Sequence, residues 1–314
     1  MGEKMLGLQD VRQRAIDYIE FRSTKKHRTR LERRTASRYT AYLERCQHEF
    51  KSLHVLDPDI QRAVREFDEQ GFTSLWTPDN QRLAESMLRK IQEEERSGVT
   101  IWAEDHRYRG EPYTTFPEIE ELFKGSLGSF LMGTYRTSFK IFYGVLYRSE
   151  RLTDRPVGSQ LWHDDGGPGT CINVMFYLKD VTKEDGALEC LPWGQSFAIF
   201  KDAPREIRRR LNAAAREGNV LSRDGAREVK CGYFAEQINR AYASSVGQPV
   251  GRAGLVVPFR NNIIHRGGYP VAGRIRYVCV FHCYPSHRPT PFERYRTGGI
   301  PKPGSYPKDP AEDF

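Results

Sequence analysis

The sequence contains no run of about 18 apolar residues, the shortest stretch that usually crosses a bilayer as a helix. Its first residues, 1–6, show no cationic segment followed by an apolar stretch, so no secretory signal is expected. An N-myristoylation motif needs Ser or Thr at the position that Leu6 occupies. These absences argue against a membrane-spanning, secreted or lipid-anchored protein and predict a cytoplasmic one.

Cysteine is scarce and unpatterned. The chain has six cysteines, and no two of them form a Cys-x-x-Cys pair. This spacing provides neither the disulfide framework of a small secreted domain nor the paired thiolates of a structural zinc site. We therefore expect six free thiols, mostly in the core, in a reducing compartment. They are Cys46, Cys171, Cys190, Cys231, Cys279 and Cys283.

Acidic residues are outnumbered, with 41 Asp and Glu against 49 Lys and Arg, which gives a formal net charge of +8. Much of this excess lies in residues 22–38, where Glu32 alone opposes the basic side chains. Those are Arg22, Lys25, Lys26, Arg28, Arg30, Arg33, Arg34 and Arg38. Such a stretch is most often a solvated helix face, so nucleic acid is not expected as a partner. The alternative is an arm that grips an anionic substrate or partner.

The length of 314 residues and the apolar content of 38% suit one large domain or two small ones. No internal repeat or clear break divides the chain. We predict a basic helical arm over 1–60, a catalytic domain over 61–285 and a Pro/Gly-rich tail over 286–314. Two helices in an insertion over 201–250 are expected either to cover the site or to decorate the surface.

Helical patterns come first and short β-rich segments follow, which predicts a mainly β core with a helical jacket, an α+β arrangement. One helix is expected to end at Gly71, and another to start with Thr77 as N-cap and Pro78 behind it. Residues 183–186 predict a hairpin turn that joins two paired strands. The expected strands cover 138–148, 159–165, 171–178, 187–191, 255–259, 263–265 and 276–284.

A His-x-Asp pattern lies in the predicted strand 159–165. Side chains alternate faces along a strand, so His163 and Asp165 share one side and Asp164 takes the other. With His265, they provide the two imidazoles and one carboxylate that hold iron in non-haem Fe(II) oxygenases. Such a triad leaves three positions of an octahedron for an anionic chelator and O2. A lone His-x-Asp pair is common by chance, so the order of the surrounding motifs decides.

Those motifs together resemble the phytanoyl-CoA dioxygenase family of Fe(II)/2-oxoglutarate oxygenases over roughly residues 65–285. The matching segments are His163-Asp164-Asp165, Tyr177-Leu178-Lys179-Asp180-Val181, Glu184-Asp185-Gly186-Ala187-Leu188, Leu191-Pro192-Trp193-Gly194, His265-Arg266-Gly267-Gly268 and Arg276. The resemblance implies a double-stranded β-helix (a cupin-like jelly roll) with iron held by His163, Asp165 and His265. It also implies that Arg276 pairs with the far carboxylate of 2-oxoglutarate, with Arg274 as the alternate.

Asn173 is a further candidate for cofactor binding. In the predicted strand 171–178 it shares a face with Met175 and Tyr177 and so points into the barrel. We expect it near 2-oxoglutarate, while a local hydrogen bond is equally open. Trp162 has the opposite parity to His163 and is expected in the core or at the rim. His282 is expected to be a packed histidine.

The resemblance implies an enzyme that uses Fe(II), 2-oxoglutarate and O2 to hydroxylate an unactivated C–H bond, with release of succinate and CO2. The substrate would be a small, perhaps anionic, metabolite or biosynthetic intermediate. Asp165 favours hydroxylation, because related halogenases have a small residue there. Two other interpretations stay open: a non-catalytic jelly-roll binding module that uses its basic arm, and a 2-oxoglutarate-independent cupin-type metalloenzyme, which would have no use for Arg276. The sequence does not indicate an oligomeric state.

Overall fold

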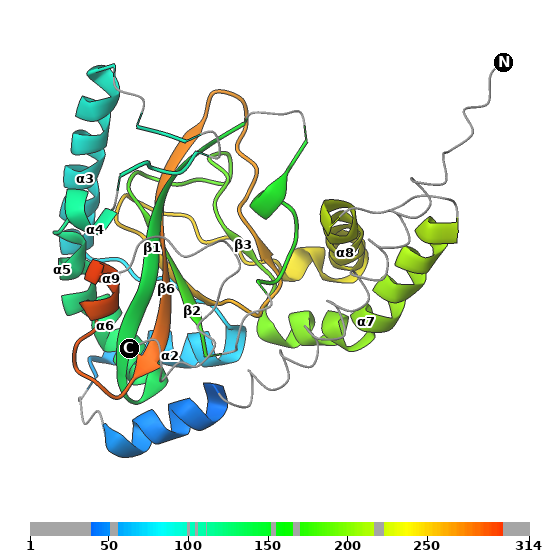
Figure 1. The fold of residues 1–314 in the computed structure, drawn as a ribbon, viewed down its shortest axis with the longest axis horizontal. Coiled ribbons are helices and arrows are strands. Elements are labelled where there is room, and N and C mark those ends of the chain that lie inside the picture. Colours follow the sequence, from blue (N-terminus) through cyan, green and yellow to red (C-terminus); the bar gives the residue numbers. More distant parts are fainter. Residues whose placement is uncertain are drawn as a thin grey trace, which may run out of the picture.

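Figure 1 shows the computed structural model of the chain. It describes residues 39–50, 56–98, 101–103, 106–110, 112–151, 155–165, 170–216 and 223–297. The basic stretch 22–38 and residues 298–314 lie outside this range, and with them most of the predicted arm and most of the predicted tail. The division into arm, catalytic domain and tail stays a prediction.

Four long strands form the main sheet, and every neighbouring pair is antiparallel. In spatial order they are β1 (Ser138–Glu150), β6 (Ile275–Ser286), β2 (Ile172–Tyr177) and β4 (Val256–Arg260). Each contains aromatic or β-branched residues, which suit a pleated and largely buried surface.

A second, shorter sheet faces the barrel interior from the other side. It pairs β3 (Glu189–Cys190) with β5 (His265–Arg266). Single bridges extend it on both sides, from His163 to His265 and from Cys190 to Gly247. Successive segments therefore alternate between the two sheets along the chain, which is the connectivity of a double-stranded β-helix. The predicted mainly β fold with a jelly-roll core is confirmed.

Helices cover both sides of this core (Figure 1). On the outer face of the main sheet lie α2 (Pro58–Gln70), α3 (Pro78–Arg96), α4 (Pro112–Thr115), α5 (Ile119–Lys124), α6 (Ser126–Tyr135) and α9 (Glu293–Thr297). The largest apolar cluster joins these helices to the outward side chains of the strands, such as Phe176, Cys279 and Phe281. Further helical turns cover Gly158–Gln160 (η1), Ile238–Tyr242 (η2), Ala243–Ser245 (η3) and residues 39–49.

Two long helices, α7 (Trp193–Arg216) and α8 (Arg223–Gln237), cover the outer face of the short sheet. Ile199 of α7 and Phe234 of α8 form one apolar cluster with Trp162 and Ile264. None of the helices in the described ranges has both the length and the apolar character needed to cross a bilayer. All six cysteines are free and buried, as predicted.

The predicted helix ends are confirmed. Gly71 follows α2 with φ +82°, a left-handed conformation that glycine adopts without steric cost, and its N–H donates to the carbonyl of Phe67. Thr77 caps α3 by accepting a hydrogen bond from the N–H of Asn80, and Pro78 is the first helical residue.

The predicted hairpin is wrong. Residues 183–186 do make a turn, but it carries the chain from β2 in the main sheet to β3 in the short sheet. A tight turn between two β-rich segments has the same residue preferences whether the strands pair or separate. The paired segment after the turn is also shorter than predicted, Glu189–Cys190 instead of 187–191.

The insertion begins earlier than predicted. The first helix, α7, already starts at Trp193 and contains Pro204 within its length. The second helix runs over Arg223–Gln237, and η2 and η3 continue the helical path to Ser245. Gly247, near the end of the predicted insertion, is part of the β core through its bridge to Cys190.

Candidate metal centre

The structure brings His163, Asp165 and His265 together at one end of the barrel. Each offers one ligand atom, and these atoms all lie within 4.8 Å of one another. The Nε2 atom of His163 lies 3.6 Å from Oδ1 of Asp165, and that of His265 lies 3.7 Å from Oδ2. Their assignment as iron ligands stays a prediction that this geometry supports.

The backbone holds both imidazoles in the same tautomer. Nδ1 of His163 lies 2.7 Å from the carbonyl oxygen of Leu161, and Nδ1 of His265 lies 3.0 Å from that of Ile263. Because a carbonyl only accepts, each Nδ1 carries the proton and Nε2 keeps its lone pair. This is the arrangement by which proteins orient histidine ligands.

The segment that carries His163 is not a regular strand. Gly158–Gln160 forms a 3₁₀ turn, and a single bridge at His163 replaces the predicted strand 159–165. The alternation that we expected still holds at the motif. Asp164 forms an ion pair with Lys230 of α8, away from the two ligand candidates.

Asn173 holds the carboxylate of Asp165. Its Nδ2 donates to Oδ2 of Asp165 at 2.6 Å, and its side chain is buried on β2. The expected orientation into the barrel is therefore observed, but the hydrogen bond goes to the predicted metal ligand instead of to a co-substrate. A proton donor on this oxygen fixes the angle of the carboxylate.

The inner face of the main sheet consists of cross-strand rows, because paired residues of antiparallel strands point to the same side. The rows are Tyr143, His282, Asn173 and Phe259; then Val145, Val280, Met175 and Val257; then Tyr147, Val278 and Tyr177; then Ser149 and Arg276. The first row touches the triad through Asn173 and through Phe259, whose ring centroid lies 4.8 Å from that of His265. The middle rows are largely apolar.

Arg276 lies at the opposite end of these rows and is only 5% exposed. One nitrogen, Nη2, donates to Oγ of Ser149 at 3.2 Å. Within the described part of the chain, its buried Nε and Nη1 have no hydrogen-bond partner. A buried guanidinium with open donors is costly unless an anion pairs with it. The fork approaches Gly267, where an added Cβ would lie 3.3 Å from Nη2.

Arg274, the predicted alternate, is not part of this site. It lies before β6, is half exposed and pairs with Glu184 at 3.2 Å on the surface. Arg274 and Arg276 have the same parity, yet only Arg276 lies within the paired strand. The strand boundary, which the sequence did not determine, separates the two arginines.

Burial and neighbouring charges set the protonation of the centre. Burial, assisted by the positive charge of His265, lowers the pKa of His163 to about 4. Burial also lowers the pKa of His282 to about 4. Burial alone would raise the pKa of Asp165, but His265, His163 and the hydrogen bond from Asn173 outweigh it, so that this pKa is lowered. Near pH 7 His163 is therefore neutral and Asp165 is ionised, the protonation states in which these groups bind a divalent metal.

The depressed histidine pKa values predict how the metal-free protein responds to acid. An unfolded histidine has a pKa near 6.5, so the unfolded chain takes up protons between about pH 6.5 and 4 that folded His163 and His282 do not. The free energy of unfolding should therefore fall as the pH falls through this window. Denaturant titrations between pH 7 and 4.5 measure it. The His163→Gln variant should show a smaller decrease than wild type, whereas a variant of the partly exposed His287, His287→Gln, should not. Equal slopes in His163→Gln and wild type would contradict the prediction.

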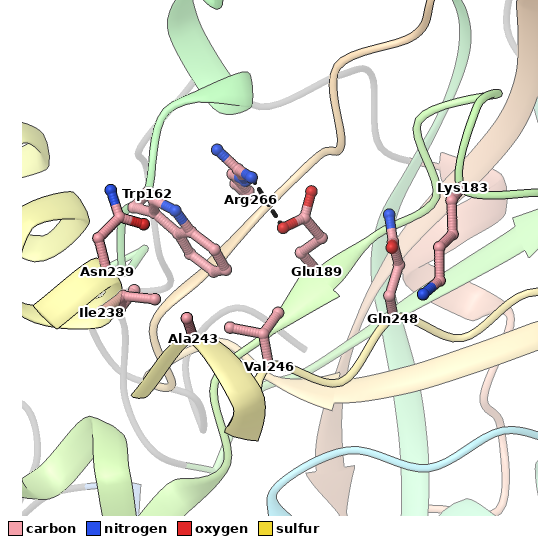
Figure 2. Close-up of a pocket in the computed structure, with 9 residues that line it drawn as sticks. All are labelled: Trp162, Lys183, Glu189, Ile238, Asn239, Ala243, Val246, Gln248 and Arg266. Atoms are coloured by element: carbon pink, nitrogen blue, oxygen red, sulfur yellow. Dashed lines mark hydrogen bonds and ion pairs between the residues drawn. The ribbon is translucent and has the colours of Figure 1, made fainter. Parts of the chain in front are cut away.

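The outer face of the short sheet carries a separate cavity, with a volume of about 340 Å³ (Figure 2). Trp162 and Arg266 line it. Trp162 precedes His163 and Arg266 follows His265, so both side chains lie on the face opposite to the predicted ligands. The guanidinium of Arg266 lies 4.5 Å from the Trp162 ring centroid and donates to Glu189 at 2.8 Å. Trp162 thus packs in the core, as expected, and the cavity does not open onto the triad side of this sheet.

Several contacts of the centre could not be predicted from the sequence. Ser149, which holds Arg276, and Tyr143, which contacts His282, carried no motif signal because their roles depend on pairing between β1 and β6. Lys230, the partner of Asp164, lies in an insertion whose docking the sequence did not indicate. His282 was assigned to packing, although its place opposite Asn173 puts it in the row beside the triad.

The chain is similar to one curated enzyme over part of its length. It is 30% identical to L-proline trans-4-hydroxylase from Streptomyces griseoviridis over 126 residues, which cover 38% of this chain and 43% of that protein. The match therefore spans less than half of the relative. No family model matches the sequence.

Solved structures with a similar fold share little sequence. EctD from S. alaskensis, crystallised with 2-oxoglutarate and 5-hydroxyectoine, has a TM-score of 0.49 at 13% identity, covering 78% of this chain and 86% of EctD. AviO1 from Streptomyces viridochromogenes Tue57 has a TM-score of 0.47 at 16% identity, covering 75% of this chain and 99% of AviO1. The fold assignment for this chain rests on its own strand pairing.

Proposed function

We propose that this chain is an Fe(II)- and 2-oxoglutarate-dependent oxygenase that hydroxylates an unactivated C–H bond of a small molecule. The observation that carries the proposal is Arg276, a buried guanidinium with two open donors in the barrel that holds the triad. A metal site alone would fit several enzyme classes, but the arginine selects for an anionic co-substrate. The family resemblance of the motifs and the partial similarity to a proline hydroxylase support the same assignment.

In this proposal His163, Asp165 and His265 hold Fe(II) through two imidazole nitrogens and a carboxylate oxygen, a donor set typical of non-haem iron. Bound iron supplies the O2 chemistry that turns 2-oxoglutarate into succinate and CO2 and hydroxylates the substrate. Asn173 keeps the Asp165 carboxylate at a fixed angle, and the carbonyls of Leu161 and Ile263 keep both rings in the binding tautomer.

Arg276 positions 2-oxoglutarate by pairing with the carboxylate that is remote from the metal. A guanidinium presents two parallel donors that match a carboxylate, and Ser149 holds the fork from behind. The residues between Arg276 and the triad, such as Met175, Val278 and Val280, form apolar walls. These walls exclude water and strengthen the ion pair.

The substrate is proposed from the partial relative alone. Because the similar enzyme is an L-proline trans-4-hydroxylase, L-proline is the first compound that we would test, followed by other small amino acids.

The proposal predicts a spectroscopic signal that needs no substrate. Adding Fe(II) and then 2-oxoglutarate to metal-free protein without oxygen should produce the weak visible charge-transfer band of the chelate. His163→Ala should abolish this band, because one of the three ligands is lost. With oxygen and L-proline present, succinate release should then follow turnover. Iron binding without a band would refute the 2-oxoglutarate assignment and favour a cupin-type enzyme.

A further inference from the structure

Several polar groups in the four inner rows of the main sheet have a role in the proposed function or a local hydrogen-bond partner. Asn173 donates to Asp165, Ser149 accepts from Arg276, and Arg276 is assigned to 2-oxoglutarate. Tyr177 accepts a hydrogen bond from the N–H of Leu188 at 2.9 Å. The proposed function gives no role to the pair of Tyr143 and His282, at the end of the rows where the triad lies.

Tyr143 and His282 face each other across β1 and β6. Their rings are stacked with centroids 4.2 Å apart and planes at 17°, and the Tyr143 hydroxyl lies 2.8 Å from Nε2 of His282. The other ring nitrogen, Nδ1, is buried and has no hydrogen-bond partner among the described residues. A buried polar atom without a partner costs about 1–3 kcal/mol, which a bound ligand would remove.

The hydrogen bond between Tyr143 and His282 can run in either direction, because a phenol can donate to Nε2 or accept from it. In the tautomer that we take, the phenol donates to Nε2. A neutral imidazole that accepts at Nε2 carries its hydrogen at Nδ1. The open position of His282 is then a donor, and it needs an acceptor from outside the protein.

The location of His282 separates it from the co-substrate site. His282 lies directly opposite Asn173, which contacts Asp165, so it belongs to the row at the metal. Arg276 lies six residues earlier on the same strand, three rows away, and its guanidinium reaches toward Gly267, two residues after His265. A molecule that bridges the triad and Arg276 therefore lies on the Arg276 side of the metal, whereas His282 lies in the first row.

One cation, Arg107, lies beside these rows. Arg107 bridges to Tyr147 of β1, and its guanidinium carbon lies 5.5 Å from the Tyr147 ring centroid, on the inner side of the sheet. Its charge also opposes the rise in the pKa of Tyr143 that burial causes. The inner rows contain no carboxylate, and Asp165 is assigned to the metal. An anionic acceptor therefore fits better than a neutral one.

We propose that His282, held by Tyr143, is a substrate-binding residue that donates from Nδ1 to a carboxylate of the substrate, with Arg107 providing the opposite charge. This inference rests on the proposed function, because it takes the metal and 2-oxoglutarate positions from it. It names the substrate class as small carboxylic acids.

The first experiment determines the tautomer. The full chain, loaded with Zn(II) as a diamagnetic stand-in and with 2-oxoglutarate, is labelled with ¹⁵N-histidine, and His282 is assigned by comparison with His282→Phe. Long-range ¹H–¹⁵N correlations should show a protonated Nδ1 and an unprotonated Nε2. Tyr143→Phe should change this pattern, since the donor to Nε2 is lost. An unprotonated Nδ1 in wild type would overturn the proposal.

The second experiment measures recognition with two matched probes, cyclopentanecarboxylate and cyclopentanecarboxamide, titrated into the same loaded protein by calorimetry. Wild type should bind the acid about 10-fold more tightly than the amide, the usual effect of a charge-assisted hydrogen bond. His282→Phe, which keeps the ring stack, and Arg107→Gln should each remove most of this preference. The matched controls His287→Gln and Arg109→Gln should keep it, since both lie away from the inner rows.

The outcomes separate this inference from the proposed function. The anaerobic Fe(II)/2-oxoglutarate band should form in wild type and in His282→Phe. If it forms in both, but wild type binds neither probe or binds both equally, the carboxylate assignment is wrong while the oxygenase assignment stands. If the band forms in neither, the proposed function itself fails.

Discussion

Replacing Arg276 with Gln should weaken 2-oxoglutarate binding by about 100-fold or more and leave Fe(II) binding almost unchanged. Removing one partner of a buried, hydrogen-bonded ion pair typically costs about 3–5 kcal/mol, and each 1.4 kcal/mol is about a factor of ten. Arg276 is nearly fully buried, and two of its donors are open to the co-substrate. The intensity of the anaerobic charge-transfer band as a function of 2-oxoglutarate concentration measures the change.

Arg274→Gln is the matched control for this experiment. Arg274 has the same chemistry two positions earlier, but it is half exposed and pairs with Glu184 on the surface. Exposed ion pairs contribute about 0–1 kcal/mol, so 2-oxoglutarate binding should stay within about twofold of wild type. A large effect of Arg274→Gln, or none of Arg276→Gln, would show that the co-substrate carboxylate binds elsewhere.

Asp165→Asn should lower the affinity for Fe(II) by at least about 100-fold. Outer partners of metal ligands typically contribute about 10–100-fold to affinity, and Asp165 is a predicted ligand that also supplies the one negative charge of the triad. Asparagine keeps the size of the side chain and can still accept from Asn173, so the fold should survive. Competition with a metal-binding dye under anaerobic conditions measures the affinity.

The neighbouring carboxylate provides the control. Asp164→Asn removes the same charge one residue away, but Asp164 forms an ion pair with Lys230 of α8 and lies apart from the cluster of ligand atoms. Fe(II) affinity in Asp164→Asn should change by less than about threefold, because Asp164 neither belongs to the predicted ligands nor holds one of them in place. Similar losses in both variants would mean that Asp165 acts through the general charge of the segment and does not bind the metal.

Rules that depend only on neighbouring residues were enough to predict part of this structure from the sequence. Thr77 and Pro78 begin a helix and Gly71 ends one because a cap depends on only a few neighbouring residues. Alternation along an extended chain was enough to place His163 and Asp165 on one side and Asp164 on the other, even though the segment forms only a single bridge. The motif order also indicated the jelly roll that the strand pairing shows.

Other features were decided only when distant segments came together. The turn at 183–186 joins two sheets and not a hairpin, because strand partners are chosen by burial of whole faces and not by turn residues. Asn173 binds Asp165 because the barrel closes between them, eight residues apart along the chain. Arg276 is buried and Arg274 exposed because β6 begins at Ile275. His282 meets Tyr143 only through the register of β1 and β6. Local sequence sets the direction of a side chain, but its partner depends on which strand is placed beside it.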